Sequence, residues 1–95
     1  MATPRGQDWT FLSNHGHVLV AVSRDPRSRL RDIAAVVGIT ERTAQGVLKD
    51  LEDAGYVSKT KVGRRNEYQL NPELRLRHPA ESGTPISDLL GIFEP

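Results

Sequence analysis

The hydrophobic pattern of this chain changes its period at Gly55, and that change limits the folds that are open to it. Before Gly55, apolar residues recur at the spacing of amphipathic helices; after it, they alternate as in a strand. A chain of 95 residues buries one modest core, so these elements have to pack on one another. The pattern predicts one small domain that is mainly α with a small β-hairpin, an α+β fold.

The first predicted helix lies between a polar segment, residues 1–8, and the pair Asp25-Pro26. We expect residues 1–8 to form a flexible N-terminal tail. Ser13 can cap the start of the helix, and Asp25-Pro26 ends it. The apolar stripe of the helix follows the i, i+4, i+7, i+8, i+11 spacing, and its members are Phe11, His15, Val18, Leu19 and Val22. Leu12 and Val20 lie off this stripe, which makes the apolar arc wider than one small core requires.

Two further amphipathic patterns predict a pair of helices joined by a tight turn at Gly38, which supplies the positive φ that ends the first of them. This helix is capped by Ser28 or begins at about Arg31, after a short extended piece. Thr40 caps the next helix, and Gly55 closes it. The inward positions of the pair are Leu30, Ile33, Ala34 and Val37, then Ala44, Val47, Leu48 and Leu51.

The segment after Gly55 predicts a β-hairpin with a cationic tip. YVSKTK and NEYQL read as strands, VGRR as the turn between them, and Pro72 ends the second strand. The hairpin carries four cations, and no acidic residue follows them until Glu67. This is more positive charge than a hairpin tip needs for solubility or for protection of a sheet edge. These cations are Lys59, Lys61, Arg64 and Arg65.

Charge is unevenly distributed along the chain, although its formal net charge is only +1. The stretch from Arg24 to Arg65 holds ten basic and six acidic residues, whereas the remainder holds three basic and six acidic. Positive charge therefore gathers in the middle of the chain, where the two central helices and the hairpin lie.

The segment LRDIAAVVGITERTAQGVLKDL resembles the helix-turn-helix unit of bacterial regulators, and AGYVSKTKVGRRNEYQL looks like the wing of a winged helix. Residues 10–70 are similar to the winged helix-turn-helix domains of MarR-type and ArsR-type transcriptional regulators, in particular to a compact, actinobacterial-looking subgroup. The resemblance implies a DNA-binding domain over residues 9–71, with three helices and a wing. Residues 72–95 then form a C-terminal extension with a short helix.

The third helix, residues 41–51, is expected to enter the major groove of double-stranded DNA. Its outward side chains suit base reading: Arg42 can fork onto guanine, Gln45 onto adenine, and the Thr43 methyl group can touch thymine. Glu41 either favours the helix N-terminus electrostatically or accepts from cytosine. The predicted contact residues of this helix and its cap are Thr40, Glu41, Arg42, Thr43, Gln45, Gly46 and Lys49.

The cationic part of the hairpin, residues 59–66, is expected to hold the DNA backbone or a narrow minor groove next to that helix. Its predicted contacts are Lys59, Lys61, Arg64 and Arg65, and Arg31 joins them as a phosphate contact. Arg24, Arg27 and Arg29 are either solvated or paired with nearby acids. The acids at the far end of the third helix, Asp50, Glu52 and Asp53, mark where DNA is not expected.

The last predicted helix, in TPISDLLGIFEP, has Thr84 as cap and Pro85 as first residue. It packs on its own domain, or it joins the first helix in a homodimer. We favour the homodimer, because a regulator of this size needs two copies to bind paired half-sites. The predicted dimerisation residues are Leu12, Val20, Ile86, Leu89, Leu90 and Phe93.

Other classes of function find little support. His15 and His17 point about 200° apart on a helix and cannot share a metal, and His15 is expected in the core. Cysteine is absent, and no motif for catalysis or phosphate binding occurs, so we expect no metal, no cofactor and no enzyme. No segment is apolar enough to span a bilayer, which favours the cytoplasm. Two alternatives remain open: a winged-helix protein-interaction module that does not bind DNA, and a small-molecule or metal sensor whose effector is unknown.

Overall fold

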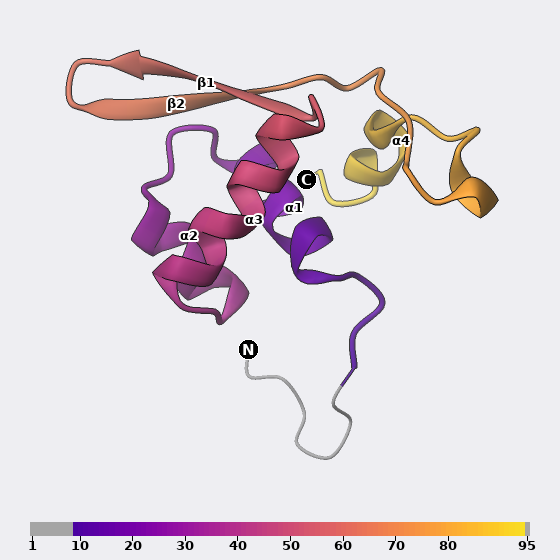
Figure 1. Cartoon of the computed structure of the whole chain (residues 1–95), viewed down its shortest axis with the longest axis horizontal. Coiled ribbons are helices and arrows are strands. Elements are labelled where there is room, and N and C mark those ends of the chain that lie inside the picture. The colour runs from indigo at the N-terminus through magenta and orange to yellow at the C-terminus, as the bar shows by residue number, and fades with distance from the viewer. Residues whose placement is uncertain (1–8, 95) are drawn as a thin grey trace.

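The computed structural model describes residues 9–94, which form three helices, a β-hairpin and a short C-terminal helix (Figure 1). The predicted fold class is confirmed, and the predicted flexible tail, residues 1–8, lies outside the described residues. The elements are α1 (Asn14–Arg24), α2 (Leu30–Val37), α3 (Glu41–Asp53), β1 (Val57–Val62), β2 (Arg65–Leu70), a 3₁₀ helix (Pro79–Glu81) and α4 (Ile86–Gly91).

Local capping residues determine where the first three helices begin and end. The Ser13 hydroxyl accepts from the backbone N–H of Gly16 at the start of α1. Gly38 has φ 84°, and its N–H donates to the Ala34 carbonyl at 2.8 Å, which ends α2 in the left-handed conformation. Ser28 is not the cap of α2. Arg29 is the N-cap, without a side-chain hydrogen bond, and its extended backbone agrees with the second prediction, although the helix begins at Leu30, one residue before Arg31.

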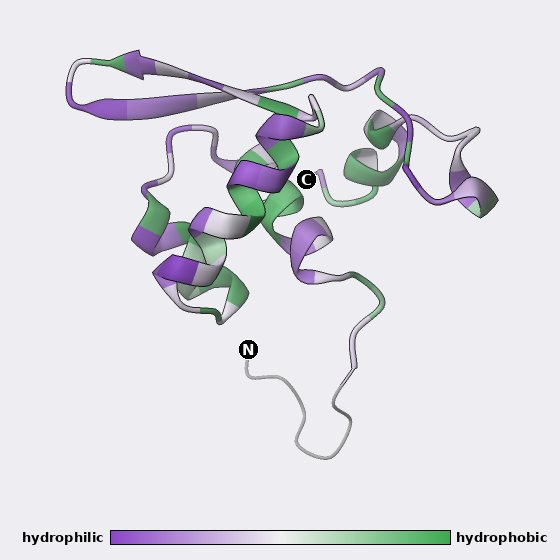
Figure 2. Cartoon of the chain, viewed as in Figure 1, coloured by the Kyte–Doolittle hydropathy of each residue, from purple (hydrophilic) through white to green (hydrophobic). Residues whose placement is uncertain are grey.

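The core lies where the three helices meet beneath the base of the hairpin. Val18 and Val22 of α1 and Ile33 of α2 are almost fully buried, as are Ala44 and Leu48 of α3. Figure 2 shows the corresponding hydrophobic segments on the helices and a more hydrophilic β2 strand. This burial supplies most of the driving force for folding.

The hairpin is a two-stranded antiparallel sheet whose register runs from Val57↔Leu70 to Val62↔Arg65. Gly63 and Arg64 form its turn, and Gly63 has φ 64°, a conformation that a two-residue hairpin turn requires. Val57 and Tyr68 are buried, so the base of the hairpin covers the core. The other edge of β2 is also partly paired, because the Tyr68 N–H donates to the Pro26 carbonyl at 2.9 Å.

The C-terminal helix belongs to the same core, which corrects part of the dimerisation prediction. Ile86 is 0% and Leu90 5% exposed, so neither side chain is available to a second copy in this structure. The Ile86 N–H donates to the Leu74 carbonyl at 2.9 Å, and the Tyr56 hydroxyl donates to the Arg75 carbonyl. The N-cap of α4 is Pro85 rather than Thr84, because the chain stays extended through Pro85.

The segment before α1 also differs from its prediction. Phe11 was expected on the buried stripe of the first helix, but it precedes α1 and is 94% exposed. Its ring meets that of Trp9 edge to face, with the ring centroids 5.3 Å apart. Within the described residues, no helix is both long and apolar enough to cross a membrane.

We predict that Ile86→Ala lowers the free energy of unfolding by about 2–5 kcal/mol, because it opens a cavity in the core. The matched control is Ile92→Ala, since Ile92 lies six residues further on and is 72% exposed. We expect the control to change stability by less than about 0.5 kcal/mol. Urea denaturation measures both values, and similar values for the two variants would contradict the burial of α4 in this domain.

Candidate nucleic-acid interface

The outward face of α3 presents its polar residues to solvent. Ala44, Val47, Leu48 and Leu51 are buried against the other elements, because they share the inward side of the helix. The predicted contact residues are all exposed, and they are Thr40, Glu41, Arg42, Thr43, Gln45, Gly46 and Lys49. The separation of the two faces follows the predicted pattern, and the structure brings these residues together on one helix.

The start of α3 is held by the side chain of Thr40. Its hydroxyl accepts from the Thr43 N–H at 3.0 Å and donates to the Thr43 hydroxyl at 2.9 Å. This pair satisfies one of the free N–H groups at the helix start and fixes the first turn. Thr40 is thus a capping residue. Arg42, two residues further on, makes no ion pair with another described residue.

Gly46 leaves open space on the exposed side of α3. A Cβ atom added there would meet no atom of the described residues within 4 Å, and the backbone of Gly46 does not have a positive φ. Glycine inside a helix costs about 1 kcal/mol relative to alanine, and neither local conformation nor packing explains it here. A close approach of another molecule to this face is a physical reason for it.

The acids in the C-terminal half of α3 are all paired. Asp53 Oδ2 lies 3.2 Å from Lys49 Nζ, and Glu52 Oε1 lies 3.7 Å from Lys59 Nζ on β1. Asp50 Oδ2 lies 2.8 Å from His15 Nε2. Two of the predicted cationic contacts, Lys49 and Lys59, therefore already have acidic partners.

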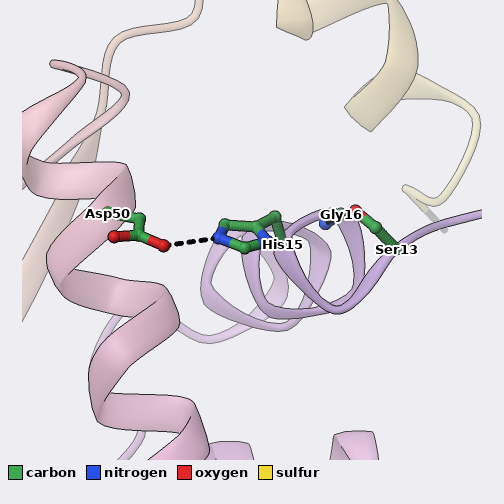
Figure 3. Close-up of polar contacts among 4 residues, drawn as sticks. All are labelled: Ser13, His15, Gly16 and Asp50. Atoms are coloured by element: carbon green, nitrogen blue, oxygen red, sulfur yellow. Dashed lines mark hydrogen bonds and ion pairs between the residues drawn. The ribbon is translucent and has the colours of Figure 1, made fainter.

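His15 is a correction to the sequence prediction, because it was expected in the core. Its side chain is half exposed and extends from α1 toward Asp50 on α3 (Figure 3). A polar ring next to a carboxylate at the surface keeps both groups hydrated, which burial would not. Among the described residues, no group of three or more His, Cys, Asp or Glu is placed to hold a metal ion.

The cations of the hairpin have different surroundings. Arg65 does not project from the tip: its guanidinium donates to the Arg27 carbonyl at 2.8 Å and so holds β2 to the loop between α1 and α2. Arg27 in turn lies 3.4 Å from the Glu67 carboxylate. Lys61 and Arg64 are exposed and have no acidic partner in the part of the chain that the structure describes.

A cationic hollow of about 370 Å³ lies between the start of α2 and the hairpin. Figure 1 shows the tip of the hairpin on the same side of the molecule as α2. Burial, followed by the charge of Glu52, raises the pKa of the Tyr68 hydroxyl, so Tyr68 is a neutral wall of this hollow. The lining residues are Ser28, Arg29, Leu30, Arg64, Arg65, Asn66 and Tyr68.

Five lining residues of this hollow were missing from the predicted contact set: Ser28, Arg29, Leu30, Asn66 and Tyr68. The cluster of arginines before α2 was visible in the sequence, but nothing local indicated that Arg29 and Arg64 line the same hollow. Arg31, which was predicted to contact phosphate, is exposed on the first turn of α2 and does not line the hollow.

Residues 13–58 match a family model described as winged helix-turn-helix DNA-binding. The match runs from the cap of α1 into β1 and includes the whole of α3, so its exposed face belongs to the matched region. The rest of the hairpin and α4 lie beyond it. No curated protein matches the chain.

Proposed function

We propose that this winged helix-turn-helix DNA-binding domain acts as a sequence-specific transcriptional regulator, with α3 in the major groove of double-stranded DNA. One observation carries the proposal: the N-terminal half of α3 is exposed, polar and glycine-containing, while the acids of its other half are paired. Such a face brings base-reading side chains to DNA, and Glu41 is its one acidic residue.

We assign recognition of the DNA base sequence to side chains on the first two turns of α3. Arg42 presents a guanidinium that makes no ion pair within residues 9–94, and this group suits the two acceptors of guanine in the major groove. Gln45 suits adenine, the Thr43 methyl group suits thymine, and Glu41 can accept from cytosine. The open space at Gly46 lets the helix approach the groove closely.

We assign most of the affinity for the DNA backbone to the hairpin and to the cationic hollow beside it. Lys61 and Arg64 would contact phosphate or enter the minor groove, because no described acid competes for them. Arg29 and Arg31 extend this surface onto α2. Arg65 contributes the donors that are left after its hydrogen bond to the Arg27 carbonyl, and Lys49 and Lys59 contribute less, since their acidic partners offset their charge.

We also propose that the protein is a bacterial, cytoplasmic regulator of the MarR-like or ArsR-like type, on the resemblance of residues 10–70. The alternative is a winged-helix module that binds another protein and not DNA. The two differ in their response to salt, because phosphate contacts release counterions and make DNA affinity fall steeply with salt concentration.

We predict that Arg64→Ala weakens DNA binding and reduces the slope of log K against log salt by about 1, the loss of one phosphate contact. The control is Arg75→Ala, which removes the same charge from the exposed C-terminal segment. Fluorescence anisotropy with a duplex at several salt concentrations gives both slopes. Equal slopes for Arg64→Ala, Arg75→Ala and the unmodified protein would refute the role of the hairpin.

We predict that Arg42→Ala relaxes the preference at one base position and costs about 1–3 kcal/mol on the best sequence. Selection of bound duplexes from a random pool identifies the preferred motif for each protein. Lys49→Ala is the control, because Lys49 lies on the same helix but is paired with Asp53. Recovery of an unchanged motif with Arg42→Ala would rule out base reading by this residue.

We further propose that the protein binds DNA as a homodimer, formed through the apolar residues near α1 and α4 that its own core leaves partly exposed: Leu12, Val20, Leu89 and Phe93. Two copies would read two half-sites and gain affinity together.

We predict that Phe93→Asp yields monomers in light scattering, while the circular dichroism spectrum stays unchanged. A charge at the buried Leu90 would unfold the domain and is not a useful test. A folded Phe93→Asp variant with the mass of a dimer would exclude this surface.

A further inference from the structure

The half of the hairpin next to its turn lies away from the hydrophobic core. Val57 and Tyr68 at the base are buried, but every residue from 58 to 66 is exposed. A two-stranded hairpin is only marginally stable in water, so the ladder between β1 and β2 does not by itself fix the position of the turn. Figure 1 shows the hairpin extending beyond the helices, with the loop between α1 and α2 below β2.

Arg65 joins the turn end of the hairpin to this loop. It is the first residue of β2, and its Nη2 atom donates to the Arg27 carbonyl at 2.8 Å. Among residues 9–94, no other hydrogen bond or ion pair joins residues 61–66 to a segment outside the hairpin. The Arg65 guanidinium therefore ties the turn to the helices.

The loop that accepts this hydrogen bond is itself held in a defined turn. Asp25 Oδ1 accepts from the Arg27 N–H at 3.2 Å, and the Asp25 carbonyl accepts from the Ser28 N–H at 3.1 Å. The Tyr68 N–H donates to the Pro26 carbonyl at 2.9 Å, which joins the loop to the base of β2. The Arg27 carbonyl is therefore a fixed acceptor on the body of the domain.

The two consecutive arginines at the turn have different surroundings. Arg64 makes no hydrogen bond or ion pair through its side chain with a described residue, whereas Arg65 is held by a backbone carbonyl. A carbonyl is a neutral acceptor, so this bond uses part of the guanidinium fork without cancelling its charge. Arg65 can thus fix the turn while the surface stays positive.

We propose that Arg65 is a positioning residue for DNA binding, which acts through Arg64: its bond to the Arg27 carbonyl holds the turn, and with it the Arg64 guanidinium, in the place where the DNA backbone meets it. Order that exists before binding reduces the conformational entropy lost on association. The effect on DNA binding rests on the proposed function, whereas the order of the turn does not.

The first test follows backbone amide relaxation by NMR, without DNA. We expect the Gly63 and Arg64 amides to have order parameters near those of the base, about 0.85, and to fall below about 0.6 in Arg65→Lys. The lysine side chain is shorter and its ammonium is strongly hydrated, so it keeps the charge and loses the bond. Arg64→Lys, the same change one residue earlier, is the control and should leave these values unchanged.

The second test measures affinity for a duplex selected from a random pool, at several salt concentrations. Arg65→Lys should weaken binding about tenfold at each of them, because the turn now loses its freedom on binding. The slope of log K against log salt should stay the same, since the complex keeps all of its cations. Arg64→Lys should bind within about twofold of the unmodified protein, because lysine also contacts phosphate.

Three results would overturn the proposal. The first is a turn that stays as ordered as the base in Arg65→Lys. The second is unweakened binding by this variant, which would make Arg65 a plain phosphate contact. The third is an equal loss of affinity in Arg64→Lys. Failure of the unmodified protein to bind any duplex would refute the proposed function, and the relaxation measurements would still decide whether Arg65 holds the turn.

Discussion

The inward face of α3 is buried against α1 and α2, and this packing positions the rest of the molecule. Ala44 and Leu48 are almost fully buried, as are Val22 and Ile33 opposite them. Because a helix has only one side to bury in so small a core, the side chains of Arg42 and Gln45 necessarily face solvent. The interface with DNA proposed for α3 is a consequence of this burial.

The pairing of charges then divides the cations of the chain into two groups. Asp53 and Glu52 hold Lys49 and Lys59, so the C-terminal end of α3 and the base of the hairpin are locally balanced. Arg64, at the turn, has no such partner among the described residues. A nearly neutral protein can therefore carry a concentrated positive surface, because its acids lie beside the cations at one end of the hairpin only.

The short α4 helix has two roles in this structure. Ile86 and Leu90 close the core beside Tyr56, while the half-buried Leu89 faces a cavity between α1 and α3. A helix of six residues cannot be stable alone, so its position depends on this burial. The C-terminal segment is thus part of the domain, and the surface left for a second copy is smaller than its apolar sequence indicates.

The sequence by itself determined the features that depend on residues within a turn of one another. The cap at Thr40, the left-handed turn at Gly38 and the change of period at Gly55 each follow from local hydrogen bonding and backbone sterics. Only the tertiary structure decided the contacts between distant residues. It placed His15 beside Asp50, held Arg65 to the Arg27 carbonyl and buried Ile86, because these contacts depend on how the elements pack in space and not on neighbours along the chain.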